Sequence, residues 1–207
     1  MTDQIALPFQ WPADEDERDF IVSDCNRMAV KHLEHWSLWP VMASVLTGPR
    51  KSGRSLLGRI FAVKTGGRFI DNAEEQDETR MFHAWNDAQA DRKPILFAAD
   101  LPPAKWRIRL PDLRSRLLAS PHVAIEEPDM ELMAALIEKL LHARSLAAPP
   151  DVIRYVVPRI ERSYIGVGRI VDALDESALA RRKAISLKVA REALATIGIT
   201  DDNYKLL

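Results

Sequence analysis

The sequence predicts an α/β protein in which helices cover a mostly parallel sheet, followed by a region built of helices alone. Before Pro128, short apolar segments typical of strands alternate with segments of helical periodicity. After Pro128, every periodic segment has helical spacing. We therefore expect an N-terminal leader over residues 1–19, an α/β domain over 20–128 and a helical lid domain over 129–207.

The expected strands are short apolar runs that end at glycine, aspartate or proline. Residues 41–47 and 94–99 are continuously apolar, which is typical of strands buried on both faces of a parallel sheet. Two shorter runs, residues 68–71 and 122–125, complete the set. Four strands that alternate with helices predict crossover connections and one parallel sheet.

The expected helices have apolar residues at three- and four-residue spacing. Met28 and Leu33 fall on the apolar face of the first helix. Asp24 is the expected N-cap of this helix. Val63 falls on the apolar face of the second helix. The eight predicted helices span residues 26–36, 55–64, 78–92, 110–118, 130–146, 151–162, 164–174 and 186–197.

Composition and charge restrict the class of protein. The chain has 29 Lys and Arg against 30 Asp and Glu, a formal net charge of -1, so it has no overall electrostatic attraction to DNA or to an anionic membrane. Its one cysteine, Cys25, rules out a disulfide framework. No apolar run approaches the roughly 18–20 residues of a membrane span. We expect a cytoplasmic protein with no membrane partner.

A glycine-rich loop follows the strand over residues 41–47 and opens a helix. It departs from the phosphate-binding pattern G-x-x-x-x-G-K-[ST] only in having arginine at the lysine position. In such a loop, backbone N–H groups and the helix N-terminus surround phosphate oxygens. A turn that binds nothing is the alternative. The residues expected to bind a nucleotide here are Gly48, Lys51, Ser52, Gly53, Arg54 and Ser55.

Two aspartates follow later strands at the edge where ligands bind in such sheets. Asp71 is the candidate to hold Mg²⁺ together with the Ser55 hydroxyl, and Asp100 is a candidate polar sensor near the phosphates. Asn72 is neutral and cannot act as a base, so the site is poorly equipped for hydrolysis. The alternative for Asp71 and Asn72 is a helix-capping turn.

These segments together resemble the DnaA-related AAA+ proteins, in particular the Hda-type regulatory inactivators of DnaA. The similarity extends over nearly the whole chain. Besides the phosphate loop, it rests on the segment Phe20 to Ala29, on Asp100-Leu101-Pro102-Pro103 after the strand, and on Pro111-Asp112-Leu113-Arg114-Ser115-Arg116.

The resemblance implies a P-loop AAA+ sheet with a helical lid. The interval between the phosphate loop and Asp71 is too short for one of the family's strands, so we expect four core strands instead of five. The family's lid sensor arginine aligns with Ile165, and the sequence does not indicate whether Arg162 or Arg169 replaces it. The sequence ends at Leu207, and we expect no DNA-reading domain, so contact with DNA would be indirect.

Arg116 matches the arginine finger of the family, which enters the nucleotide site of a neighbouring molecule. An arginine supplied in trans stabilises charge on a transferring phosphoryl group. The resemblance thus implies that Arg116 acts on the ATP bound to DnaA. The alternative is a surface salt bridge to Asp112, one helical turn earlier.

The leader carries a short peptide that resembles the motif by which proteins bind the sliding clamp of DNA polymerase III. Leu7 and Phe9 are apolar anchors for a pocket, and Pro8 restricts the free peptide. A hydrophobic tail that packs on its own domain is the alternative. The residues of the expected contact are Gln4, Ile5, Leu7, Pro8 and Phe9.

The function expected from the resemblance is regulation of chromosome replication initiation. The chain would bind the clamp and stimulate ATP hydrolysis by DnaA through Arg116, with little or no ATPase activity of its own. Two alternatives stay open: an autonomous P-loop ATPase, and a DnaA-like DNA-binding initiation factor. The sequence leaves open whether ADP or ATP with Mg²⁺ is bound or the site is nucleotide-free, and whether the protein self-associates.

Overall fold

The computed structural model describes residues 20–181 and 184–199. Its centre is one four-stranded parallel sheet with the strand order β2-β3-β1-β4. The strands are β1 (Ala43–Thr47), β2 (Arg68–Ile70), β3 (Ile95–Ala99) and β4 (His122–Ala124). The structure confirms the predicted α/β class and the four core strands.

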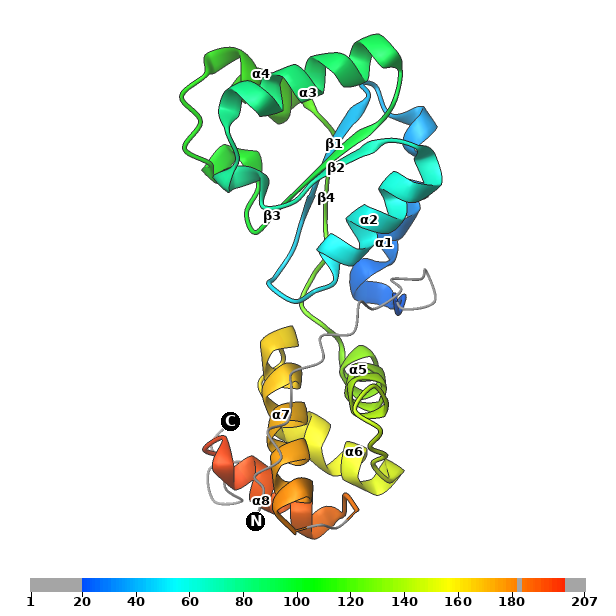
Figure 1. Ribbon diagram of the computed structural model, residues 1–207, viewed down its shortest axis with the longest axis vertical. Coiled ribbons are helices and arrows are strands. Elements are labelled where there is room, and N and C mark those ends of the chain that lie inside the picture. Colours follow the sequence, from blue (N-terminus) through cyan, green and yellow to red (C-terminus); the bar gives the residue numbers. More distant parts are fainter. Residues whose placement is uncertain (1–19, 182–183, 200–207) are drawn as a thin grey trace, which may run out of the picture.

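The two central strands are buried on both faces, as their continuous apolar sequences predict. Every residue of β1 and β3 is buried, and the strands pair in register from Ala43 with Ile95 to Thr47 with Ala99. Val45 and Phe97 pack beneath α3 and α4, whereas Leu46 packs with α1 and α2 on the opposite face. Figure 1 shows these two helix layers on either side of the sheet.

The helices of the α/β part are α1 (Asp24–Glu34), α2 (Arg54–Thr65), α3 (Glu78–Asp91) and α4 (Pro111–Ala119). The expected N-cap of the first helix was wrong, because Asp24 is its first residue and Ser23 is the N-cap. The Ser23 backbone N–H donates to Asn26 Oδ1 at 2.9 Å. Met28 and Val63 were wrongly expected on apolar faces, since both are exposed.

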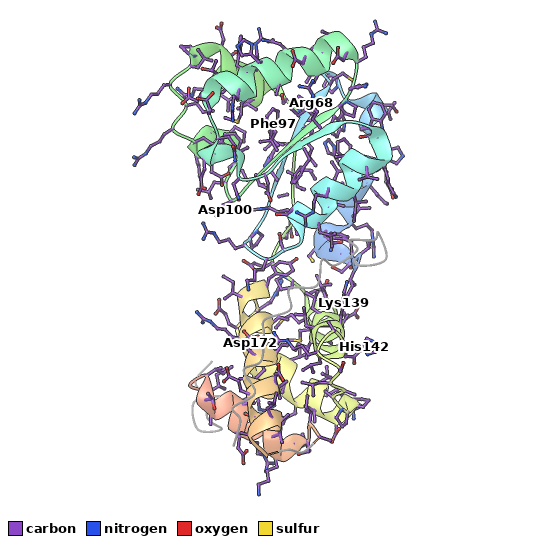
Figure 2. All side chains as sticks on the ribbon, viewed as in Figure 1. Arg68, Phe97, Asp100, Lys139, His142 and Asp172 are labelled. Atoms are coloured by element: carbon purple, nitrogen blue, oxygen red, sulfur yellow. The ribbon has the colours of Figure 1, made fainter. Side chains whose placement is uncertain are left out.

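The C-terminal part consists of α5 (Met130–His142), α6 (Pro150–Val156), α7 (Tyr164–Arg181) and α8 (Leu187–Thr196). These helices have a core of their own, in which Ile137, Ile170 and Leu174 are fully buried. Figure 1 shows them grouped below the sheet, and Figure 2 places Asp172 on α7 and Phe97 inside the α/β part. The boundaries expected between the domains stay a prediction.

Three predicted helices of this part end several residues from their predicted ends, and the one predicted over 130–146 stops at His142. The helix predicted over 151–162 stops at Val156 and continues as one 3₁₀ turn, Val157–Arg159. Pro158 explains the change, because it removes a backbone donor and crowds the preceding turn. The helix predicted to end at residue 174 instead continues to Arg181.

Hydrogen bonds join the first turn of α7 to the end of the sheet. The Tyr164 hydroxyl donates to the Glu126 carbonyl oxygen at 3.1 Å and lies 3.6 Å from Cys25 Sγ. Burial raises the pKa of the Tyr164 hydroxyl, so the group stays a protonated donor. Arg162 Nε donates to the Pro128 carbonyl oxygen at 3.0 Å. Across the described residues, no helix is both long and apolar enough for a membrane span.

Candidate functional site

The phosphate-type loop lies between β1 and α2, at the end of the sheet nearer the C-terminal helices. Gly53 has φ +86° as the N-cap of α2, and a side chain there would also meet the Phe20 ring at 3.1 Å. Lys51 has φ +65°, which is uncommon for a residue with a Cβ. The backbone therefore adopts the tight turn that the glycine pattern predicts.

Arg54, at the position of the usual lysine, turns its side chain into its own protein. Its side chain is only 8% exposed. Nη1 donates to the Gly48 carbonyl oxygen at 2.6 Å, and Nη2 pairs with the Asp100 carboxylate. The lysine of a standard loop reaches the β- and γ-phosphates of the nucleotide. Here the equivalent positive charge is neutralised within the chain.

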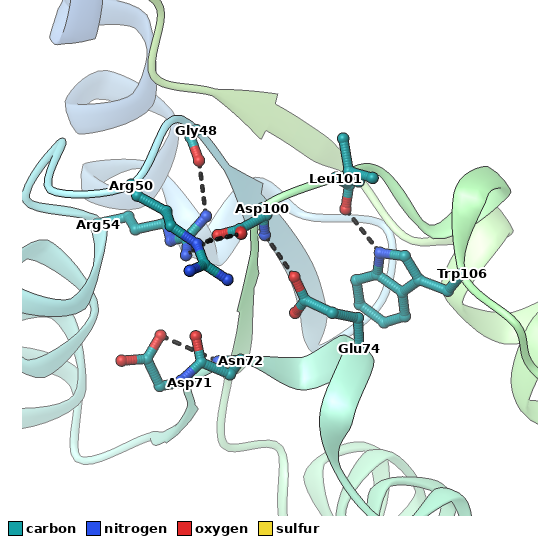
Figure 3. Close-up of polar contacts among 9 residues, drawn as sticks. All are labelled: Gly48, Arg50, Arg54, Asp71, Asn72, Glu74, Asp100, Leu101 and Trp106. Carbon is teal, nitrogen blue, oxygen red and sulfur yellow. Dashed lines mark hydrogen bonds and ion pairs between the residues drawn. The ribbon is translucent and has the colours of Figure 1, made fainter. Parts of the chain in front are cut away.

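Asp100 joins the loop to the end of β3. Figure 3 shows Arg54 and Arg50 converging on its carboxylate, with Glu74 reaching its backbone from the other side. Arg50 Nε donates to Asp100 Oδ2 at 2.9 Å, and the Asp100 backbone N–H donates to Glu74 Oε1 at 2.6 Å. Burial raises the pKa of the Asp100 carboxyl, but the hydrogen bonds from Arg50 and Arg54 outweigh it and hold the pKa below its ordinary value.

Asp71, one of the two expected magnesium ligands, lies in a turn of its own. Asp71 Oδ1 accepts a hydrogen bond from the Asn72 backbone N–H at 3.0 Å, and the Asp71 carbonyl oxygen accepts one from Gln76. Asn72 has φ +47° and occupies the N-cap position of a 3₁₀ turn, but its side chain makes no capping hydrogen bond. Among the residues described, no three His, Cys, Asp or Glu side chains gather as a metal site.

A hollow of about 490 Å³ lies over the start of α2. It is lined by loop residues that include Arg50, Lys51, Arg54 and Ser55. The Ser52 hydroxyl beneath the loop is buried and has no hydrogen-bond partner among the described residues. The hollow is therefore a polar and mainly basic concavity, suited to an anion once Asp100 no longer neutralises it.

Sequence reasoning missed Arg50 and Glu74. Arg50 occupies a variable position of the loop motif, and Glu74 acts through a backbone group of a residue far along the chain. Neither position belongs to a recognisable pattern. Only the parallel arrangement of β2, β3 and β1 brings these residues to one edge of the sheet.

Arg116 lies on α4 and is half-buried against α3. Its guanidinium carbon is 4.7 Å from the ring centroids of both Phe82 and Trp85, and Nη1 donates to Asn86 Oδ1. Among the described residues, Arg116 forms no salt bridge with Asp112, the partner of the alternative interpretation. The three α3 side chains fix the direction of the guanidinium, and no sequence pattern indicated them.

Comparison with known proteins gives relatives among the replication initiators, although no protein-family model matches the sequence. The chain is 25% identical over 122 residues to the chromosomal replication initiator DnaA of Nautilia profundicola, a match that covers 58% of this chain and 28% of that protein. Domain III of DnaA from Thermotoga maritima superposes with a TM-score of 0.72 at 17% identity, over 89% of this chain and 97% of that one.

The protein has a DnaA-like AAA+ fold. The AMPPCP-bound DnaA of Aquifex aeolicus is a further neighbour, with a TM-score of 0.58, 21% identity, and coverage of 79% of this chain and 65% of that one. This chain thus spans about a quarter of the N. profundicola protein and about two thirds of the A. aeolicus chain. It is related to the AAA+ domain of the DnaA initiators.

The remaining DnaA-related expectations concern residues at the margins of the site. Ile165, at the position expected for the lid sensor, is exposed on the first turn of α7. Arg169 is exposed one turn later, whereas Arg162 bonds to Pro128. The clamp-binding peptide, Gln4 to Phe9, lies outside the described residues.

Proposed function

We propose that this DnaA-like protein regulates chromosome replication initiation by stimulating ATP hydrolysis on DnaA in trans. Its relationship to the DnaA AAA+ domain supports a partner of the same class. The observation that carries the proposal is the pairing of Arg54 with Asp100, which neutralises the cation of the protein's own loop. A chain of this fold without a working loop can still act by supplying Arg116 to a neighbour.

Transfer of Arg116 from its own chain to a phosphate has a cost that the partner's transition state must offset. Leaving the Phe82 and Trp85 rings costs about 0.5–2 kcal/mol for each cation–π contact, and the charged-donor bond to Asn86 adds about 1.5–3 kcal/mol. An arginine finger accelerates phosphoryl transfer by roughly 10³–10⁵, which corresponds to about 4–7 kcal/mol. The gain in the transition state is therefore of the size needed to offset the cost of release.

The protein's own site is proposed to hold ADP or ATP weakly or not at all. A neighbouring DnaA structure contains AMPPCP, which supports nucleotide binding by this fold. In this chain, a triphosphate would approach Lys51 and Ser55 while Asp100 repels it. Bound Mg²⁺ would use Ser55 and Asp71 after Asp71 leaves its turn.

We also propose that the peptide Gln4 to Phe9 binds the sliding clamp, so that the protein acts where replication is under way. The expected contacts are the Gln4 amide and the apolar Leu7 and Phe9 side chains. Pull-down of the clamp by the full chain tests this step. Replacing Leu7 and Phe9 with Ala should abolish capture while the melting temperature stays unchanged.

The decisive assay is single-turnover hydrolysis of ATP preloaded on cognate DnaA, with the full chain, clamp and DNA present. Arg116→Ala should remove the stimulation, and Arg116→Lys should restore only a small part because lysine lacks the planar fork. Arg154→Ala, at an exposed position on α6, serves as the matched control and should stimulate normally. Full stimulation by Arg116→Ala would show that another residue supplies the charge.

A further inference from the structure

The segment that leads into and forms α4 is strongly basic, although the whole chain has a net charge of -1. Arg116 accounts for only one of the charges. Between residues 105 and 116 the single acidic residue is Asp112, and the five basic residues are Lys105, Arg107, Arg109, Arg114 and Arg116. Four of these five are arginine, the cation that is enriched at protein interfaces, where lysine is depleted.

Three of these arginines face outward. Arg107 and Arg109 are exposed, and Ile108 between them packs toward the core with Leu110, as expected of an extended segment. Arg114 is exposed on α4. The side chains of the three have no hydrogen bond or ion pair with any described residue. We call Arg107, Arg109 and Arg114 the arginine surface.

The arginine surface borders a hollow of about 360 Å³. Its lining includes Arg109 and Arg114 beside the apolar Ile108, Pro111 and Leu118, of which Leu118 is 50% exposed. Apolar residues next to arginines are typical of protein–protein interfaces. An exposed leucine at this position gains burial only if a partner covers it.

The Glu78 carboxylate bonds to the backbone beside these arginines and not to their guanidinium groups. Glu78 accepts hydrogen bonds from the backbone N–H groups of Arg109 and Leu110, at 2.7–3.0 Å, and so caps the approach to α4. The three exposed guanidinium groups have no ion-pair partner among the described residues. A partner protein can supply the carboxylates that pair with them.

We propose that the arginine surface is the docking site for an acidic protein surface beside the nucleotide of the ATP-bound partner. This inference rests on the proposed function, because α4 carries both Arg114 of this surface and, on another side of the helix, Arg116. The apolar residues that line the hollow fit protein side chains better than a sugar–phosphate backbone. The arginine surface provides affinity and association rate, and Arg116 provides the chemistry.

The test is direct binding of the full chain to immobilised ATP-loaded DnaA, together with titration of the ATPase stimulation. The variant Arg107→Gln/Arg109→Gln/Arg114→Gln should raise the dissociation constant and the half-saturating concentration about ten-fold or more. The maximal stimulated rate should stay within about two-fold, and binding should depend less on salt. The triple lysine variant should recover most of the affinity, and Arg154→Gln should behave as wild type.

Three results would overturn this inference. The first is an unchanged dissociation constant for the triple glutamine variant. The second is a lower maximal rate without weaker binding, which would place these arginines with the finger. The third is equally salt-dependent capture of a duplex DNA oligonucleotide, lost in the same variant, which would make nucleic acid the partner. Binding that follows the prediction without any stimulation would overturn the proposed function and leave the docking surface supported.

Discussion

Asp100→Asn should turn the self-neutralised loop into a free anion site. Asp100 joins the buried Arg54 to the exposed Arg50, and its own side chain is 32% exposed. Removing one partner of a fully buried ion pair costs about 3–5 kcal/mol, and partial access of water to Asp100 reduces this to about 2 kcal/mol. For a chain of this length, we expect the melting temperature to fall by roughly 4–8 °C.

The same variant should bind phosphate better than the wild type. With the carboxylate gone, Arg54 and Arg50 face the hollow over α2 with uncompensated charge. Pyrophosphate at one hundred times its dissociation constant would stabilise the variant by about 2.7 kcal/mol, enough to offset the loss. Thermal unfolding with and without pyrophosphate, and calorimetry with ADP, measure both effects.

Arg50→Ala is the matched control, because it removes the exposed half of the same cluster. Its side chain is 72% exposed, so we expect only a small change in melting temperature and no gain in phosphate affinity. The reasoning is refuted if the melting temperature of Asp100→Asn equals that of the wild type. It is equally refuted if the wild-type loop binds pyrophosphate as tightly as the variant does.

Two further predictions concern stability. Gly67→Ala should destabilise the fold by about 2 kcal/mol or more in thermal unfolding, because the added Cβ would lie 2.2 Å from the Pro94 carbonyl oxygen. The control is Gly168→Ala, whose added Cβ has no neighbour within contact distance. This variant should be neutral or stabilising. Burial lowers the pKa values of His32 and His122, so the unfolded chain binds more protons and stability should fall as the pH drops below about 6.5. A free energy of unfolding that is constant from about pH 7.5 to 5.5 would contradict this second prediction.

The strands and the site scaffold could be predicted because they depend on local patterns. The apolar runs that became β1 and β3 need burial on both faces, and only a parallel sheet between helices provides it. The loop between β1 and α2 carries its own backbone signal in Gly48 and Gly53. The class, the four strands and the position of the candidate site follow from these features.

The interactions inside the site could not be predicted, because they join residues far apart in the chain. The sequence around Arg54 is compatible with phosphate binding. Only the fold shows that Arg54 pairs with Asp100. Likewise, α4 suggested a partner one turn away for Arg116, whereas tertiary packing offered Asn86 and two rings on α3. Periodicity also misplaced Met28, which no element of the described residues buries.

The most direct test of the central claim compares two single variants in the stimulated hydrolysis of ATP on cognate DnaA. Ser55→Ala removes a hydroxyl from the chain's own loop, and Arg116→Ala removes the finger. The account predicts that Ser55→Ala stimulates as well as the wild type and that Arg116→Ala does not stimulate. Full stimulation by Arg116→Ala would contradict it, and so would loss of stimulation in Ser55→Ala.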